Sequence, residues 1–180
     1  MLFHVSKERG IEQFVPRGSE GGAGQVVWAI DAGRLCNYLV PRECPRVTYY
    51  AGRETTAADV ERFLGSRRAV IAIEQTWFER VRSSRLYCYH LPPDTFECID
   101  ECAGYFVSRV PVTPACVEVF DDPATELLQR GVELRVVPNL WPLRDAVIAS
   151  SLQFSMIRMR NALPRDDLTG AGAVAPTTGR

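Results

Sequence analysis

The apolar stretch from Leu2 to Ser6 carries the first side chains that could do chemistry: His4, one of only two histidines, and the hydroxyl of Ser6. An imidazole changes charge near neutral pH, so His4 could act as a general base or contact a ligand. A backbone carbonyl at the end of a strand would satisfy the same ring without any functional role. We therefore predict His4 as a catalytic residue and Ser6 as a ligand-binding neighbour, with a structural histidine as the alternative.

Arg42 and Arg46 form a second candidate site, because each follows a proline in the segment from Pro41 to Arg46. A guanidinium group binds carboxylates and phosphates through two parallel hydrogen bonds. Prolines on either side reduce the loop freedom that is lost on binding. The pair is predicted to bind an anion. Ion pairing with Glu43, with Asp31 or with the more acidic second half of the chain is the structural alternative.

Aromatic rings near these groups could stack on a ligand. Trp28 lies in the apolar run from Gln25 to Ile30, and Tyr38 lies in a short helix predicted just after that run. Both are predicted as ligand-binding residues. A late carboxylate, Glu118, could complete a site with His4, although a solvated surface glutamate is the simpler interpretation.

The six cysteines, at positions 36, 44, 88, 98, 102 and 116, include no CxxC pair. Cys98 and Cys102 are four apart, which suits neither a zinc knuckle nor a thioredoxin-like motif. Most of the cysteines are predicted to be small buried hydrophobic residues. No metal is assigned, and a metal or redox site that uses His4, His90 and a cysteine is the least favoured alternative.

Composition limits the class of protein. The chain has 180 residues, of which 46% are apolar and 24% charged, and its formal net charge is −1. We expect one globular domain with no general attraction for nucleic acid or anionic lipid. No apolar run reaches the roughly 20 residues of a membrane helix, and the N-terminus lacks a signal-peptide pattern. The protein is therefore expected to be cytoplasmic. The composition does not indicate its oligomeric state.

Apolar runs and turn residues predict an α+β fold with a mixed, mostly antiparallel sheet of roughly seven to nine strands and four or five helices. The clearest strands are 2–6, 25–30, 69–74, 86–91 and 132–137. The glycine-rich segment 17–24 is predicted as a loop, and without a GKS or GKT ending it is not a phosphate cradle. A last helix is predicted from Ser150 to Asn161, with its arginines exposed. Residues 1–163 should form the single domain, and residues 164–180 a disordered tail.

Several segments resemble a family of uncharacterised bacterial proteins, a domain of unknown function. They are LFHVS with the following GIEQFVPR, VVWAID, NYLVPRECPRV, VELRVVPNLWPLRDAV and FSMIRMRNALP, and together they span residues 2 to about 164. The resemblance covers nearly the whole chain, and it implies no activity.

The opening LFHVS, a short loop and the strand VVWAID are also similar to the start of the ADP-ribosyltransferase-like fold. That resemblance implies that His4 holds the ribose of NAD and that Trp28 or Tyr38 is the aromatic residue stacked on nicotinamide. It also implies a late-strand glutamate that activates the acceptor. Gly104 stands where this acid is expected, and Glu101 and Glu118 are displaced from it.

The leading prediction is a cytoplasmic protein with a pocket for a nucleotide-like or phosphate-bearing ligand. Its walls would be His4, Ser6, Trp28, Tyr38, Arg42 and Arg46. Transfer of ADP-ribose from NAD is the sharpest enzymatic version, and whether the protein is an enzyme stays open. The first alternative is a non-enzymatic protein-interaction module that binds through the last helix or the 42–46 loop. The second is the Cys/His metal or redox protein.

Overall fold

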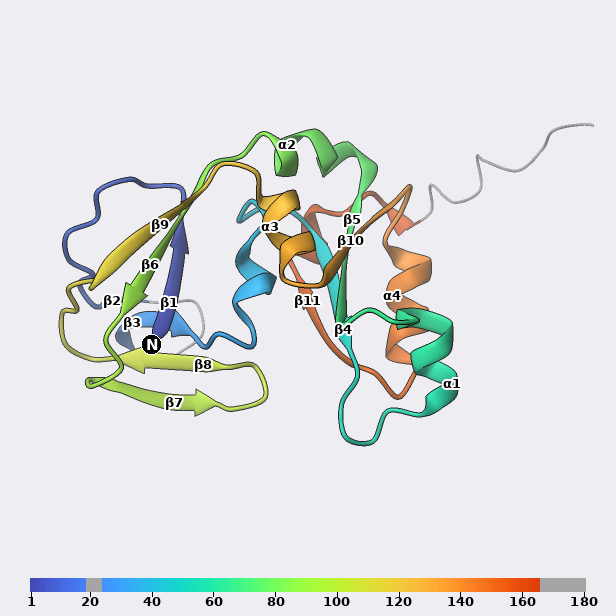
Figure 1. The fold of residues 1–180 in the computed structure, drawn as a ribbon, viewed down its shortest axis with the longest axis horizontal. Coiled ribbons are helices and arrows are strands. Elements are labelled where there is room, and N and C mark those ends of the chain that lie inside the picture. The colour runs from blue at the N-terminus through green and yellow to red at the C-terminus, as the bar shows by residue number, and fades with distance from the viewer. Residues whose placement is uncertain (19–23, 166–180) are drawn as a thin grey trace, which may run out of the picture.

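The structure, a computed structural model, describes residues 1–18 and 24–165 and confirms the predicted α+β class (Figure 1). The described residues form one compact domain with four α-helices and eleven strands in two sheets, where the sequence predicted seven to nine strands in one sheet. The additional strands are a two-residue strand in the 17–24 loop and a strand in the segment predicted as the last helix. Residues 19–23 of that loop and 166–180 of the predicted disordered tail lie outside the described residues.

The larger sheet is antiparallel throughout. Its strands are β1 (Leu2–Ser6), β2 (Arg17–Gly18), β3 (Gln25–Ile30), β6 (Leu86–Leu91), β7 (Phe96–Asp100), β8 (Tyr105–Ser108) and β9 (Cys116–Phe120). The order is β7-β8-β3-β1-β6-β9, and β2 pairs with β3. The first strand therefore lies in the middle of the sheet, between β3 and β6.

The smaller sheet is mixed and has the order β10-β5-β4-β11. Its strands are β4 (Arg46–Tyr50), β5 (Ala69–Glu74), β10 (Val132–Val137) and β11 (Gln153–Ile157). β5 and β10 are parallel, and the other pairs are antiparallel. A central strand buried on both faces needs a nearly continuous apolar run, which is what the sequence AVIAIE of β5 supplies.

The helices are short. They are α1 (Ala57–Asp59), α2 (Phe78–Arg82), α3 (Pro123–Gln129) and α4 (Trp141–Ile148), with 3-10 or π turns η1 (Leu35–Tyr38), η2 (Val60–Leu64), η3 (Gln75–Trp77) and η4 (Met159–Asn161). α1 and α4 lie on the far side of the smaller sheet, and η1 and α3 lie between the two sheets (Figure 1). In the described part of the chain, no helix is long and apolar enough to cross a membrane.

The largest apolar cluster fills the space between the two sheets. It joins Ile30 and Leu86 of the larger sheet to Ile71 and Ile73 of the smaller one, with Leu127 of α3 beside them. A second cluster lies between the smaller sheet and α4, and a third covers the opposite face of the larger sheet. Each sheet therefore has one face toward the other sheet and one face away from it.

The predicted helix from Ser150 to Asn161 is wrong, because this segment contains β11, paired with β4. Leu152, Phe154 and Met156 alternate at the spacing of a strand, and β4 has a free edge on which such a strand can pair. Arg158, at a φ of 56°, then ends the strand. The exposed basic helix face proposed for partner binding does not form.

Candidate anion-binding cleft

His4 lies on the face of the larger sheet that points away from the smaller sheet. Residues alternate between faces along a strand, and Phe3 and Val5 pack into the inter-sheet cluster, which leaves His4 on the other side. Its Nδ1 is 2.8 Å from the carbonyl oxygen of Trp28, and its ring lies 4.7 Å from that of Phe14. Burial lowers the pKa of His4, and the bond to Trp28 opposes that shift. The neutral ring of His4 therefore donates a hydrogen bond to Trp28 and packs against Phe14.

Ser6 shares this outward face and has a local partner. Its Oγ accepts a hydrogen bond from the backbone N–H of Glu8 at 3.1 Å. This is the side chain-to-backbone bond by which serine stabilises a turn.

Three other predicted residues, Trp28, Tyr38 and Arg46, do lie together, on the inter-sheet side. The rings of Trp28 and Tyr105 meet edge to face at 5.8 Å, and Tyr38 donates its hydroxyl to that of Tyr105 at 3.1 Å. The guanidinium of Arg46 lies 5.9 Å from the centre of the Tyr38 ring. Burial raises the pKa of the Tyr38 hydroxyl, which therefore stays protonated and can donate.

Arg46 is 2% exposed, and among the described residues it has no carboxylate partner. One of its terminal nitrogens donates to the carbonyl of Cys44 at 2.9 Å, and its Nε has no partner in the described chain. Burial lowers the pKa of Arg46 to about 10, so the group still carries its charge at neutral pH. Arg42 is exposed. The predicted pair is thus divided between a buried cation and a surface cation.

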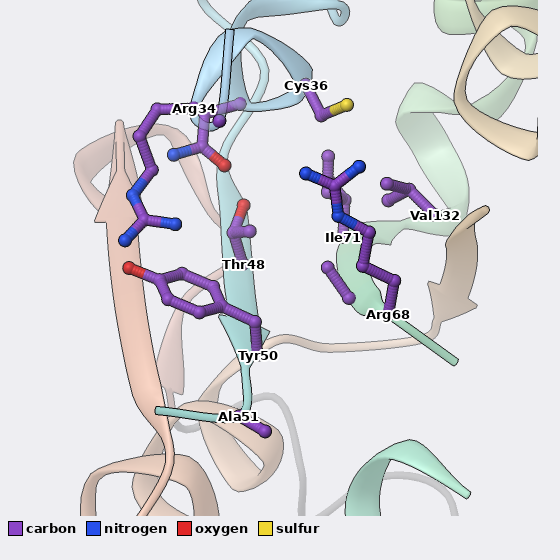
Figure 2. A pocket seen from close by; sticks show the side chains of 11 residues that line it. Arg34, Cys36, Thr48, Tyr50, Ala51, Arg68, Ile71 and Val132 are labelled. Atoms are coloured by element: carbon purple, nitrogen blue, oxygen red, sulfur yellow. The ribbon is translucent and has the colours of Figure 1, made fainter. Parts of the chain in front are cut away.

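A cavity of about 200 Å³ opens beside this cluster, between η1 and the inner face of the smaller sheet (Figure 2). It is lined by Gly33, Arg34, Cys36, Asn37, Thr48, Tyr50, Ala51, Arg68, Ala69, Ile71 and Val132. The lining contains two arginines and no acidic residue of the described chain. A second cavity of about 290 Å³ shares Arg34, Asn37 and Tyr50 with the first.

Arg34 is held in place before any ligand binds. Its backbone N–H donates to Asp31 Oδ1 at 2.8 Å, and its Nε donates to the carbonyl of Cys102 at 2.9 Å. Its guanidinium carbon lies 4.1 Å from the centre of the Tyr50 ring. No described residue forms a hydrogen bond or an ion pair with its terminal nitrogens, which can therefore bind an anion, and the fixed stem reduces the entropy lost on binding.

Gly104 allows this arrangement. Its φ is 67°, and an added Cβ would lie 2.8 Å from both the Arg34 side chain and the Asp31 carboxyl. Its carbonyl accepts a hydrogen bond from the backbone N–H of Asp31 at 3.0 Å. Gly104, which stands where an acid was expected, therefore leaves the space that the Arg34 side chain occupies.

Arg68 and Thr48 complete the cavity from the smaller sheet. Arg68 directly precedes β5, and its guanidinium points into the cavity from the side opposite Arg34 (Figure 2). Thr48 lies on β4 two residues from Arg46, and hence on the same face of the sheet. Its Oγ1 is buried and has no hydrogen-bond partner in the described chain. Neither Arg34 nor Arg68 forms an ion pair with another described residue.

The second cavity adds hydrogen-bond acceptors to the donors of the first. Its lining includes the carboxylate of Asp100 and the hydroxyls of Tyr105 and Ser155. Ser155 is the register partner of Thr48 on the neighbouring strand. The two cavities lie side by side across Arg34, Asn37 and Tyr50, and we call them together the cleft. The first cavity has two arginines in its lining, and the second has hydrogen-bond donors and acceptors.

Comparison with known families assigns the chain. A family model described as "Family of unknown function (DUF6886)" matches residues 3–162. The chain belongs to this family. Comparison with curated proteins and with solved structures gave no match. The DUF6886 assignment confirms the resemblance to an uncharacterised family, and it adds no activity to the cleft.

Of the predicted site, this DUF6886 domain brings only Trp28, Tyr38 and Arg46 near the cleft. Arg34, Arg68 and Thr48, which line it, were not predicted. A sequence signal existed for two of them: Arg34 is three residues after Asp31, a turn-capping residue, and Thr48 is a hydroxyl between apolar neighbours in a strand. No sequence signal indicated Arg68, because its position in the cavity lining depends on how the two sheets pack.

Proposed function

We propose that the inter-sheet cleft binds a small phosphate-bearing ligand, with the phosphate between Arg34 and Arg68. One observation carries the proposal: Arg34 and Arg68 line one cavity from opposite sides of Thr48, whose buried hydroxyl has no partner in the described chain, and the described lining holds no acid (Figure 2). Two guanidinium groups and a hydroxyl supply donors from three directions, as a tetrahedral anion requires. The nearby buried charge of Arg46 adds to the positive potential.

The neighbouring cavity supports a nucleotide-like or sugar-phosphate ligand over inorganic phosphate alone. Asp100 can accept hydrogen bonds from ligand hydroxyls, and Ser155 and Tyr105 can donate or accept them. Tyr50 and Arg34, shared by the two cavities, would lie where the phosphate joins the rest of the ligand. The proposal keeps the ligand class suggested by the ADP-ribosyltransferase-like resemblance. It does not include the transfer reaction, because His4 lies on the other face of its sheet.

A thermal-shift screen of the full chain tests this proposal. Inorganic phosphate, AMP, ADP-ribose and NAD are the probes, and adenosine and ribose are the uncharged controls. A ligand at 100 times its Kd that binds only the folded state adds about 2.7 kcal/mol to the unfolding free energy. We expect a rise in Tm with at least one organic phosphate that exceeds the rise with inorganic phosphate, and none with adenosine or ribose.

Variants then locate the site. Arg34→Gln and Arg68→Gln should each weaken binding by about tenfold to a hundredfold, because a hydrogen bond to a charged group contributes about 1.5–3 kcal/mol. Arg109→Gln, an exposed arginine outside both cavities, is the matched control and should bind as the wild type does. Binding that survives both cleft substitutions, or equal Tm shifts with adenosine and AMP, would refute the proposal.

A further inference from the structure

The pairing of β6 with β9 places three metal-binding side chain types on one face of the larger sheet. Cys88 and His90 are two residues apart on β6 and so share a face. Glu118 is the register partner of Cys88 on β9. Glu118 is 28 residues from His90 and 30 from Cys88, so sequence spacing does not connect it to them. His4, which the sequence analysis grouped with His90, lies on the opposite face.

The ligand atoms of the three side chains are already close. One sulfur, one ring nitrogen and one carboxylate oxygen all lie within 4.8 Å of one another. His90 Nε2 is 3.3 Å from Glu118 Oε2. A tetrahedral zinc site with bonds of about 2.0–2.3 Å holds its ligand atoms roughly 3.3–3.8 Å apart. The three atoms, all within 4.8 Å of one another, are therefore no more than about 1.5 Å beyond the separations that such a site requires.

His90 provides an independent indication. Its Nε2 is buried and has no hydrogen-bond partner in the described chain, since the contact to Glu118 lacks hydrogen-bond geometry. Buried polar atoms in native proteins almost always have a hydrogen-bond partner, and a position where an ion binds is one recognised reason for an exception. The ring is held edge-on against Phe3, 5.0 Å away, which fixes the direction of this nitrogen.

We infer that Cys88, His90 and Glu118 form a binding site for a divalent transition metal of the zinc type. Thiolate, imidazole and carboxylate are all zinc ligands, and three protein ligands leave a fourth position for water or another donor. Cys88 is fully buried and the Glu118 side chain is 51% exposed, so the ion would enter from the Glu118 side. Binding replaces the S–H bond of Cys88 by a metal–sulfur bond, and the proton passes to solvent.

Cobalt(II) titration of the chelator-treated full chain tests the site. We expect one equivalent to bind, with sulfur-to-cobalt charge-transfer absorption and the intense visible bands of tetrahedral cobalt, and zinc should displace it. Cys88→Ser should abolish the charge-transfer band. His90→Gln and Glu118→Gln should each weaken cobalt binding at least tenfold, and both keep the buried thiol and hence the packing of the core.

Cys98→Ser is the matched control, because Cys98 is an exposed cysteine on β7 at the other edge of the sheet. This variant should keep both the band and the affinity. A charge-transfer band that persists in Cys88→Ser, affinity unchanged in both His90→Gln and Glu118→Gln, or no tetrahedral cobalt spectrum in the wild type would overturn the proposal. None of these readouts depends on the phosphate cleft.

Discussion

Polar groups on the outward face of the larger sheet and polar groups in the space between the two sheets are in opposite states. On the outward face, His4 and Ser6 each have a hydrogen-bond partner within the protein. Between the sheets, Arg46 Nε and Thr48 Oγ1 are buried and have no hydrogen-bond partner in the described chain. Arg34 and Arg68 line the cavity beside Thr48 and form no ion pair with a described residue. Unpartnered buried groups cost stability. The contrast suggests that the outward face is structural and that the cleft is kept for a ligand.

The largest effect should come from Gly104, whose conformation holds Arg34 in the cleft. Gly104→Ala should cost about 1–2 kcal/mol for a left-handed backbone and about 1–3 kcal/mol more for overpacking against Arg34 and Asp31. Urea unfolding measures the loss, and phosphate binding should weaken with it.

Gly10→Ala is the matched control for this substitution. Gly10 also has a positive φ, 75°, but no atom lies within 4 Å of an added Cβ. It should cost only the backbone part, about 1–2 kcal/mol, and leave ligand affinity unchanged. Equal losses of stability and of binding in the two variants would contradict the role given to Gly104.

His4 should affect stability through pH and have no effect on the cleft. Its pKa in the folded protein lies below the ordinary value of 6.5, chiefly because the ring is buried. As the pH falls through 6.5, the unfolded chain binds a proton that the folded chain does not, so the unfolding free energy falls until the folded pKa is reached. His4→Gln should remove this part of the pH dependence in urea unfolding curves, with phosphate affinity as in the wild type. A slope that is unchanged in His4→Gln would rule out this assignment.

Thr48 should give the smallest effect and the most specific one. Thr48→Val removes an unpartnered buried hydroxyl at nearly constant volume, so the unfolding free energy should rise by about 1 kcal/mol. If the hydroxyl serves a bound phosphate, affinity should fall about threefold to tenfold in the same variant. Thermal unfolding and calorimetric titration measure the two changes. A variant that is less stable, or that binds more tightly, would show that Thr48 is not kept for a ligand.

Most of the fold could be predicted from the sequence, because local patterns determine it. The apolar runs of β3 and β5, and Asp122 with Pro123 at the start of α3, are readable one segment at a time. β11 was missed because Ile157 and Met159 interrupt the alternation of Leu152, Phe154 and Met156. The five apolar residues together also suit a helix.

The cleft could not be predicted in the same way. Alternation placed His4 on one face of a strand, but which face turns toward the second sheet depends on pairing between distant segments. Arg34 and Arg68 line the same cavity only because the chain around η1 lies against β4 and β5, and no spacing in the sequence indicates that packing. The prolines beside Arg42 and Arg46 suggested a rigid pair, yet the backbone turns one guanidinium inward and leaves the other exposed.

The contrast between the outward face of the larger sheet and the cleft can be measured directly by NMR, with ADP-ribose titrated into the isotope-labelled full chain. The account predicts that the guanidinium Nε–H signals of Arg34 and Arg68 and the amide of Thr48 shift together and saturate. The imidazole signals of His4 should stay where they are. Shifts centred on His4 with Arg34, Arg68 and Thr48 unmoved would contradict the account and return the ligand site to the first strand.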